Sequence, residues 1–588
     1  MSTAVLEPTG PPAAATDELA PAASRERRTW WWLGLAGVLA LALILRIWGS
    51  GHGLPWAYNV DENNHFVPKA IAFFNGDWNP HYFDNPPAYS YLLKLVFGVW
   101  FGGRAAVAHA FATHPGEVFQ VARVVSAVLG TLAVWLLYIA GARLIDRRVA
   151  LLAAALLSVS FLPVFYSHLA LNDVPTLFPL TLALVGTAGV LRYGRPLDYL
   201  VAGLGLGLAC ATKYTGGIAL LPLLAAAGAQ FTAPDGHRAA TTGLVLAGAT
   251  AVVCFFATDP YSLLDFSAFR DGLGHQSSVA DDAAGKLGMT HKSGVVYYLW
   301  SLTWGMGWIP ALAAVGGAVA LWRDERRLVA VLVPAPVLFL IFMGAQGRYF
   351  GRWLMPIIPI VCLLAAYAAL ELARWLARLR PALAPSLAVA GAAALCLQGL
   401  IHSVHADLVL SRTDTRNLTR QWLVDHVPVG SKLVIEPVVP DLWVMDPGHP
   451  SPVTDNGYRW QKFPTSHTQV AADGSLFPGA GRSVNIEDYE RTLRPDLIAL
   501  YEASGYCWVI TGSTQAGRAA ANPRRVPGAV AYYRALDGGE QAAFRASPFG
   551  GDQRAVPFNF DFTFDYYPLA YHRPGPVMTV YRLTGGGC

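Results

Sequence analysis

Long apolar runs alternate with short polar loops through the first 400 residues of the chain. A helix that crosses a bilayer needs about 20 largely apolar residues, with some variation from tilt. The pattern predicts eleven such helices, an odd number that places the two chain ends on opposite sides of a membrane. The predicted spans are 30–48, 117–141, 149–166, 174–191, 199–212, 216–231, 239–257, 295–322, 328–344, 353–373 and 383–401.

The basic loops predict the orientation of these spans, because short cytoplasmic loops are enriched in Lys and Arg. With the N-terminus in the cytoplasm, nearly every dense basic cluster of the membrane region falls inside: RERR (25–28), RLIDRR (143–148), RYGR (192–195), DGHR (235–238), RDERR (323–327) and RWLARLR (374–380). The same topology places outside 49–116, 167–173, 213–215, 258–294, 345–352 and the chain after 402. The apolar piece 86–103 is short and contains Lys94, which predicts an in-plane interfacial helix.

The chain after residue 402 has a different pattern, rich in Asp, Arg, Pro, Gly and Tyr. Residues 415–428 read as an amphipathic helix, and three apolar runs at 432–439, 506–513 and 577–583 read as strands. We therefore expect three parts: a disordered cytoplasmic tail (1–29), a transmembrane domain (30–401) with its first outer loop at 49–116, and an extracytoplasmic α/β domain (402–588).

Composition agrees with a multi-pass α-helical membrane protein. The chain is 54% hydrophobic and 14% charged, whereas soluble domains carry about 25% charged residues. Its 18 Trp and 24 Tyr fit membrane–water interfaces. A net charge of +4, spread over short loops, gives no support for nucleic-acid binding. The run 30–48 exceeds a signal-peptide core, which favours an uncleaved first span. Cys507 and Cys588 lie in the polar tail, where they could pair or stay apart.

The ionisable residues near the predicted helix ends gather on the outer side. A charge at a membrane segment is costly unless it lines a polar cavity, so each is a functional candidate. The set comprises Asp61, Glu62, His65, Lys69, His81, Asp84, Asp173, Lys213, Asp259, Arg348 and Arg352. One polar site at the outer surface explains this clustering most simply. Carboxylates there can remove a proton, while Arg and Lys can bind a phosphate or stabilise an anion.

Four segments carry a resemblance to a known family: VDENNHFVPKAIAFFNGDWNPHYFDNPP, YSHLALNDVP, GLGLACATKYTG and GRYFGRWLMPIIP, in this order. Over roughly residues 30–400 the chain resembles family 39 glycosyltransferases, membrane-embedded C-type enzymes that include protein O-mannosyltransferases and the aminoarabinose transferase acting on lipid A. The resemblance implies a C-type glycosyltransferase fold and transfer of a sugar from a polyprenyl-phosphate donor, with inversion, to an acceptor hydroxyl. The acceptor, a protein, lipid or glycan, stays open because the tail after 402 does not follow the best-known members.

The resemblance also implies residue roles. Asp61 looks like the general base, with Glu62 as its neighbour in the motif; Asp173 looks like a second acid near the acceptor or the base. Lys213, Arg348 and Arg352 look like ligands of the lipid phosphate. Family members need no nucleotide sugar at the site, and a metal is generally not required.

Helix geometry separates the first pair. Adjacent residues of a helix point about 100° apart, so Asp61 and Glu62 cannot face one bond. If 61–74 is helical, Asp61 shares a face with His65, which would support the base, and Glu62 shares one with Lys69. We therefore expect both to belong to the catalytic site, with Asp61 as the base and Glu62 as a structural or substrate-binding partner through Lys69.

Simpler interpretations compete with these roles. Asp61 and Asp173 could be helix caps, Lys213 could only extend to the interface, and GRYFGR could be an ordinary interfacial loop. The four outer histidines His65, His81, His275 and His291 raise the question of a metal, but their spacing fits no ligand pattern. A secondary transporter is the main alternative function; it would place charges near the midplane and show repeated halves, neither of which the sequence shows. A third possible function is that of a binding or scaffold protein that acts through its external tail and has a degenerate membrane part.

Overall fold

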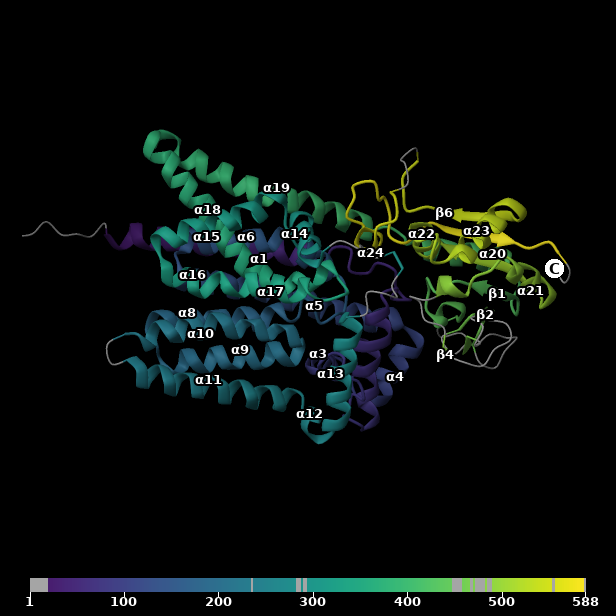
Figure 1. The fold of residues 1–588 in the computed structure, drawn as a ribbon, viewed down its shortest axis with the longest axis horizontal. Helices are drawn as coiled ribbons and strands as arrows, with labels where there is room; N and C mark the ends of the chain where they lie inside the picture. Colours follow the sequence, from purple (N-terminus) through teal and green to yellow (C-terminus); the bar gives the residue numbers. More distant parts are fainter. Residues whose placement is uncertain are drawn as a thin grey trace, which may run out of the picture.

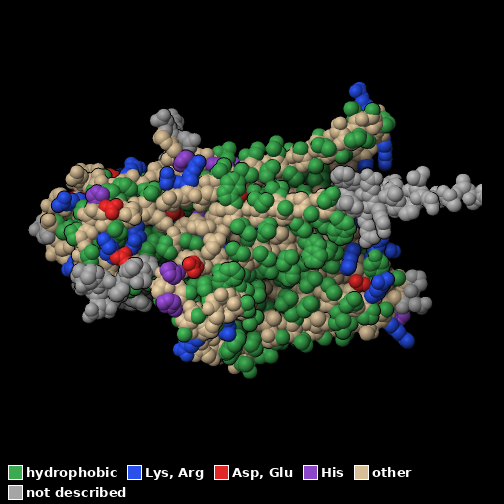
Figure 2. Space-filling model, turned by 180° about the vertical axis from the view of Figure 1, so that it is seen from behind, with side chains coloured by type: hydrophobic (Ala, Val, Ile, Leu, Met, Phe, Trp, Pro, Cys, Tyr) green, Lys and Arg blue, Asp and Glu red, His purple; other side chains and the backbone are tan. Residues whose placement is uncertain are grey.

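The computed structural model describes residues 20–233, 236–281, 287–288, 293–446, 457–465, 469–470, 482–483, 489–551, 556–585 and 588. A long bundle of roughly parallel helices occupies one end of the molecule, and a sheet domain occupies the other (Figure 1). Figure 2 shows a broad area of hydrophobic side chains across one face of the bundle, with Lys and Arg gathered at the bundle end that lies away from the sheet domain. This distribution is the one expected of a membrane-spanning bundle.

Each of the eleven predicted spans contains helix. The bundle helices are α1 (Ala20–Ile47), α5 (Pro115–Leu144), α6 (Arg147–Val159), α7 (Phe161–Tyr166), α8 (Leu177–Tyr193), α9 (Pro196–Thr212), α10 (Leu220–Phe231), α11 (Gly236–Thr258), α14 (Gly294–Gly305), α15 (Trp308–Asp324), α16 (Arg326–Leu332), α17 (Pro334–Gly344), α18 (Ile358–Leu379) and α19 (Ala384–Leu410). Among the described residues, six helical stretches are long and apolar enough to cross a membrane, or eight if each of two bent helix pairs counts as one span. The multi-pass fold is thus confirmed, while the number eleven stays a prediction.

Local sequence explains several helix ends. Pro115, Pro196 and Pro334 occupy first helical positions, where the missing N–H has no intrahelical acceptor. The Asp146 carboxylate accepts hydrogen bonds from the backbone N–H groups of Arg148 (2.7 Å) and Val149 (2.8 Å) and so caps α6.

Two boundaries differ from those predicted from the sequence. Helix α1 begins at Ala20 and so includes residues 20–29 of the tail predicted as disordered, a stretch that contains the good helix formers Ala, Arg and Glu. Residues 1–19 of that tail lie outside the described residues. Helix α19 runs to Leu410, past the expected domain boundary at 401.

Several helices run across the end of the bundle that lies toward the sheet domain (Figure 1). Helices α3 (Ala88–Trp100) and α4 (Arg104–Thr113) meet at a bend of 95°. Helix α12 (Tyr261–Leu264) leads into α13 (Phe266–Asp281). Helices α4 and α13 lie crosswise to the bundle in Figure 1. The 3₁₀ segments η3 (Tyr214–Ala219) and η4 (Gly351–Ile357) begin α10 and α18 at this end, beside the candidate site. At the opposite end of the bundle, η5 (Pro381–Leu383) links α18 to α19.

The C-terminal domain contains a five-stranded mixed sheet in the order β2-β1-β5-β7-β6. Strand β1 (Lys432–Ile435) pairs in parallel with β2 (Gln461–Phe463) and β5 (Tyr506–Gly512); β7 (Met578–Arg582) is antiparallel to β5 and to β6 (Gln541–Ala546). The strands β3 (Gln469–Val470) and β4 (Arg482–Ser483) form a separate pair. Helices are α20 (Thr415–His426), α21 (Asp496–Ala503), α22 (Ser513–Ala521), α23 (Pro527–Gly539) and α24 (Phe560–Asp565), with 3₁₀ turns η6 (Asp441–Val444) and η7 (Tyr489–Thr492). The predicted amphipathic helix and three strands are confirmed, and a disulfide joins Cys507 to Cys588 with a Cα–Cα distance of 5.3 Å.

Candidate active site

The long segment between α1 and α5 contains an unusual helical turn. A π-helix, η1 (Glu62–Phe66), continues as α2 (Val67–Ala72) and ends in the 3₁₀ turn η2 (Phe73–Asn75). The side-chain oxygen of Asn59 accepts the backbone N–H groups of Asp61 (3.1 Å) and Glu62 (3.2 Å). Asn59 therefore caps this helix, and the Asp61 side chain makes no cap hydrogen bond. The interpretation of Asp61 as a simple helix cap is wrong.

Four predicted residues from four separate elements meet beside this turn. Arg352, in η4, donates a hydrogen bond from Nη2 to Oδ2 of Asp61 at 2.7 Å. Its Nε lies 3.9 Å from Oδ2 of Asp173, which is in the loop between α7 and α8. Lys213, at the end of α9, forms an ion pair with the other carboxylate oxygen of Asp173. Because α8 begins only at Leu177, Asp173 serves this charge cluster rather than the helix end.

The side chains of the cluster differ in how much of their surface is exposed to solvent. The Asp173 side chain is 4% exposed and that of Arg352 18% exposed, while the Asp61 carboxylate is 36% exposed. The open side of the cluster is therefore the carboxylate side. Asp61 is therefore more accessible to a molecule in solvent than Arg352 or Asp173 is.

The protonation state of Asp61 reflects opposing influences. Burial raises its pKa, but the neighbouring Arg352 guanidinium, His65 and Lys213 lower it more, so the net pKa lies below the usual value. Asp61 is therefore ionised at neutral pH and able to accept a proton. Burial lowers the pKa of His65 although Asp61 opposes this, so the imidazole is neutral at pH 7.

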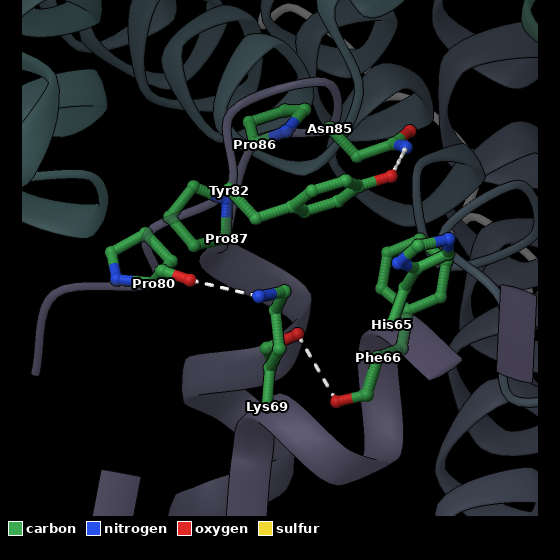
Figure 3. A pocket seen from close by; sticks show the side chains of 9 residues that line it. His65, Phe66, Lys69, Pro80, Tyr82, Asn85, Pro86 and Pro87 are labelled. Atoms are coloured by element: carbon green, nitrogen blue, oxygen red, sulfur yellow. Dashed lines mark hydrogen bonds between the residues drawn. The ribbon is translucent and has the colours of Figure 1, made fainter. Parts of the chain in front are cut away.

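A small pocket opens next to this turn (Figure 3). Its walls are His65, Phe66, Lys69, Pro80, Tyr82, Asn85, Pro86, Pro87 and Ser90. The His65 and Tyr82 rings stack with centroids 4.7 Å apart. Lys69 donates to the Pro80 carbonyl (2.9 Å) and lies 4.9 Å from the Tyr82 ring centroid.

Glu62 does not turn toward Lys69, and that prediction is wrong. Glu62 forms a two-pronged ion pair with Arg123 of α5, with Nε–Oε1 at 2.7 Å and Nη2–Oε2 at 2.8 Å. Both side chains are almost fully buried. The Glu62 carboxylate also accepts the backbone N–H of Ala170 (2.9 Å), and Arg123 donates to the carbonyls of Ser50 and His52 (2.7 Å each). Glu62 thus links η1, α5 and the loop after α7, and both of its carboxylate oxygens accept hydrogen bonds in these contacts.

The remaining predicted residues lie around the cluster. Arg348 and Arg352 both lie over the Phe350 ring, with guanidinium carbons 4.8 and 5.0 Å from its centroid. His81 pairs with Asp77, and His275 with Asp84, each at 2.8 Å on the exposed surface. His291 lies outside the described residues. Within the described part of the chain, no group of three or more His, Cys, Asp or Glu is placed to hold a metal ion.

Sequence reasoning missed two sets of residues. Arg123 stands alone inside an apolar span, which by itself marks a buried partner. The second set lies in the tail: Asp561 and Asp565 of α24 accept hydrogen bonds from the hydroxyls of Tyr297 (2.7 Å) and Tyr166 (2.8 Å). The dense aromatic and acidic run of residues 558–567 is the one signal that could have drawn attention to them.

Comparison with known proteins agrees with the predicted family resemblance. The family model described as dolichyl-phosphate-mannose-protein mannosyltransferase matches residues 84–259, a range that holds Asp173 and Lys213 but not Asp61 or Arg352. The resemblance to family 39 glycosyltransferases is thereby confirmed. A search of curated proteins finds no match.

Solved structures of membrane glycosyltransferases are among the similar folds. ArnT from Cupriavidus metallidurans, bound to undecaprenyl phosphate, is 15% identical, with a TM-score of 0.47 over 69% of this chain and 82% of that one. The Archaeoglobus fulgidus oligosaccharyltransferase AglB, in complex with an inhibitory peptide and a dolichol-phosphate, is 13% identical, with a TM-score of 0.49 over 89% of this chain and 74% of that one. The Pmt1-Pmt2 complex of S. cerevisiae, a protein O-mannosyltransferase bound to its sugar donor, is 20% identical, with a TM-score of 0.33 over 41% and 34%.

Proposed function

We propose that this chain is a membrane glycosyltransferase that moves a sugar from a polyprenyl-phosphate donor to an acceptor hydroxyl on the outer face of the membrane. One observation carries the proposal: Asp61, Arg352, Asp173 and Lys213 converge at one end of an apolar bundle. A carboxylate next to two cations at a membrane surface suits a reaction that takes a proton from one group and releases a lipid phosphate from another.

The donor phosphate binds at the cations. Arg352 pairs with Asp61 and Lys213 with Asp173, and an incoming phosphate competes for the same N–H donors. As Arg352 turns part of its charge to the phosphate, it stabilises the ionised form of Asp61 less, and the carboxylate becomes a stronger base. Donor binding and base activation are therefore coupled through one guanidinium.

The chemical step follows from this arrangement. The acceptor hydroxyl oxygen forms a bond to the anomeric carbon while the bond from that carbon to the phosphate oxygen breaks. The hydroxyl proton passes to Asp61, and the polyprenyl phosphate leaves as an anion held by Arg352 and Lys213. Attack from the face opposite the phosphate inverts the anomeric centre. Asp173 keeps the two cations in place, and the neutral imidazole of His65 lies next to the base and the pocket.

The direct test supplies purified protein in lipid with a radiolabelled polyprenyl-phosphate sugar and a mixture of envelope acceptors. We expect transfer to an acceptor with release of polyprenyl phosphate, and no transfer from the matching nucleotide sugar. EDTA should leave the rate unchanged, because Arg352 and Lys213 supply the positive charge. Use of the nucleotide sugar, or loss of activity in EDTA that divalent metal restores, would contradict the proposal.

The transporter alternative is disfavoured by the position of the charges. The four clustered residues lie at helix ends and in loops, whereas transporters place their sites near the bilayer midplane between repeated halves. Solute uptake driven by an ion gradient, without sugar transfer, would revive that alternative.

We also propose that the N-terminus faces the cytoplasm and the C-terminal domain faces outward. The distribution of basic loops supports this orientation, as does the disulfide between Cys507 and Cys588, since disulfides persist in oxidising compartments. A cysteine at Asp425→Cys should react with a membrane-impermeant maleimide in intact cells. A cysteine at Arg326→Cys should react only after permeabilisation; the reverse pattern would invert the topology.

A further inference from the structure

Helix α24 (Phe560–Asp565) belongs to the C-terminal sequence but packs against the membrane bundle. It lies between the bundle and the sheet domain (Figure 1). The Phe562 ring is 5.3 Å from the Trp300 ring and 5.5 Å from the Trp304 ring, both of α14. The Phe560 ring is 5.5 Å from that of Phe350. Aromatic packing on both helix faces therefore anchors α24 to the elements around Arg352.

Asp561 connects α24 to the residue that precedes Arg352. Both of its carboxylate oxygens accept from the Tyr297 hydroxyl at 2.7 Å, and Oδ1 also accepts the backbone N–H of Gly351 at 3.3 Å. Gly351 begins η4, whose first N–H groups have no partner within the helix. Burial raises the pKa of Asp561 to about 6, against the lowering effects of Tyr297, Gly351 and Arg352. The carboxylate is therefore mainly ionised at pH 7.5 and holds the start of η4 from outside the bundle.

Asp565 connects α24 to the other side of the guanidinium. It accepts a hydrogen bond from Tyr166 at 2.8 Å, and the Tyr166 ring centroid lies 6.0 Å from the Arg352 guanidinium carbon. Arg352 thus has its backbone fixed through Asp561 and an aromatic neighbour fixed through Asp565. Both attachments come from a segment that lies more than 200 residues further along the chain.

We propose that α24 is a positioning element for the donor-phosphate site, and that the C-terminal domain completes the active site by fixing Arg352 through Asp561. This inference rests on the proposed function, since it assigns Arg352 to the donor phosphate. A cation that stabilises a leaving phosphate must be held near its productive position, and a misplacement of about 1 Å can cost about 100-fold in rate. The C-terminal domain is then part of the catalytic machinery rather than an attached module.

The test compares variants of the full-length protein in the transfer assay. Asp561→Ala should lower kcat/KM for the polyprenyl-phosphate sugar by about 10- to 100-fold, with a higher donor KM and an unchanged acceptor KM. Asp561→Asn should recover part of this loss, because an amide oxygen can still accept from Gly351 and Tyr297. The matched control is Asp496→Ala, whose parent side chain is 61% exposed in the same domain; it should behave as wild type. Melting temperatures report whether each variant is folded.

A double variant separates positioning from general damage. If Asp561 acts through Arg352, then Arg352→Lys combined with Asp561→Ala should be no slower than Arg352→Lys alone. If the rate loss of the double variant equals the product of the two single-variant losses, the inference is overturned. A folded Asp561→Ala protein with wild-type donor kinetics would also overturn it. Binding of polyprenyl phosphate to the wild-type protein, measured apart from turnover, distinguishes failure of the proposed function from failure of this inference. A wild-type protein that neither binds this lipid nor transfers sugar overturns the proposed function and this inference together, whereas an active wild type with additive variants overturns only this inference.

Discussion

Asp61→Asn is expected to lower kcat for sugar transfer by about 10²- to 10⁴-fold, the usual contribution of a positioned general base. The substitution keeps the shape of the side chain and an oxygen that can accept the Arg352 hydrogen bond, but it removes the group that takes the proton. Binding of the polyprenyl-phosphate donor should not weaken, since Arg352 and Lys213 remain and a neutral amide competes less with the phosphate for Arg352 than a carboxylate does. The measurement is steady-state transfer with radiolabelled donor, together with a separate determination of lipid binding.

The matched control for this variant is Asp77→Asn. Asp77 lies in the same loop, is 60% exposed and pairs with His81 on the surface. We expect it to retain nearly wild-type turnover. If Asp61→Asn transferred sugar at the wild-type rate, Asp61 would not be the base, and Asp173 would be the next carboxylate to test.

The pH dependence should follow the same carboxylate. The pKa of Asp61 lies below its usual value in the donor-free protein, so kcat/KM should be constant near neutrality and fall only in acid, as Asp61 becomes protonated. The stability of the protein should change with pH in the same direction. Because folding lowers the pKa of the Asp61 carboxyl, its contribution to stability is lost as the pH falls through the folded pKa.

The bundle and the clustered charges could be predicted from sequence because each depends on local composition. An apolar run of about 20 residues specifies a spanning helix whatever its neighbours. Asp61, Asp173, Lys213 and Arg352 could be grouped because the topology places all of them at one end of that bundle. The strand-like runs at 432–439, 506–513 and 577–583 were recognisable for the same local reason.

The partners of Glu62 could not be predicted, because they depend on backbone phase and on distant chain. Glu62 and Lys69 would lie two turns apart in a regular α-helix, but the π-helix at Glu62–Phe66 changes the phase, so the two side chains diverge. Arg123 is 61 residues away. The contacts of Asp561 and Asp565 with Tyr297 and Tyr166 span 264 and 399 residues, and no periodicity encodes pairings of that range.

The buried ion pair of Glu62 and Arg123 gives the largest expected effect on stability. Glu62→Gln should lower the stability of the protein by about 3–5 kcal/mol, because removing one partner leaves a buried guanidinium without its counter-charge. Both side chains are at most 1% exposed, so water cannot solvate the remaining charge. The pair also holds together the first loop, α5 and the Ala170 backbone, so loss of activity should follow unfolding. Thermal melting in detergent, read alongside transfer activity below the melting temperature, measures both effects.

Two further variants make the cause of that loss specific. Removing both charges, as in Glu62→Leu with Arg123→Met, should recover part of the lost stability, because no charge is then buried alone. Arg270→Gln, which breaks the exposed pair of Arg270 and Asp271, should leave the melting temperature unchanged. A Glu62→Gln protein that melted like wild type but lost activity would instead place Glu62 in the chemistry, as its position beside Asp61 in the motif suggests. The two outcomes divide the paired carboxylates into one that holds the loop and one that takes the proton, or assign both to the reaction.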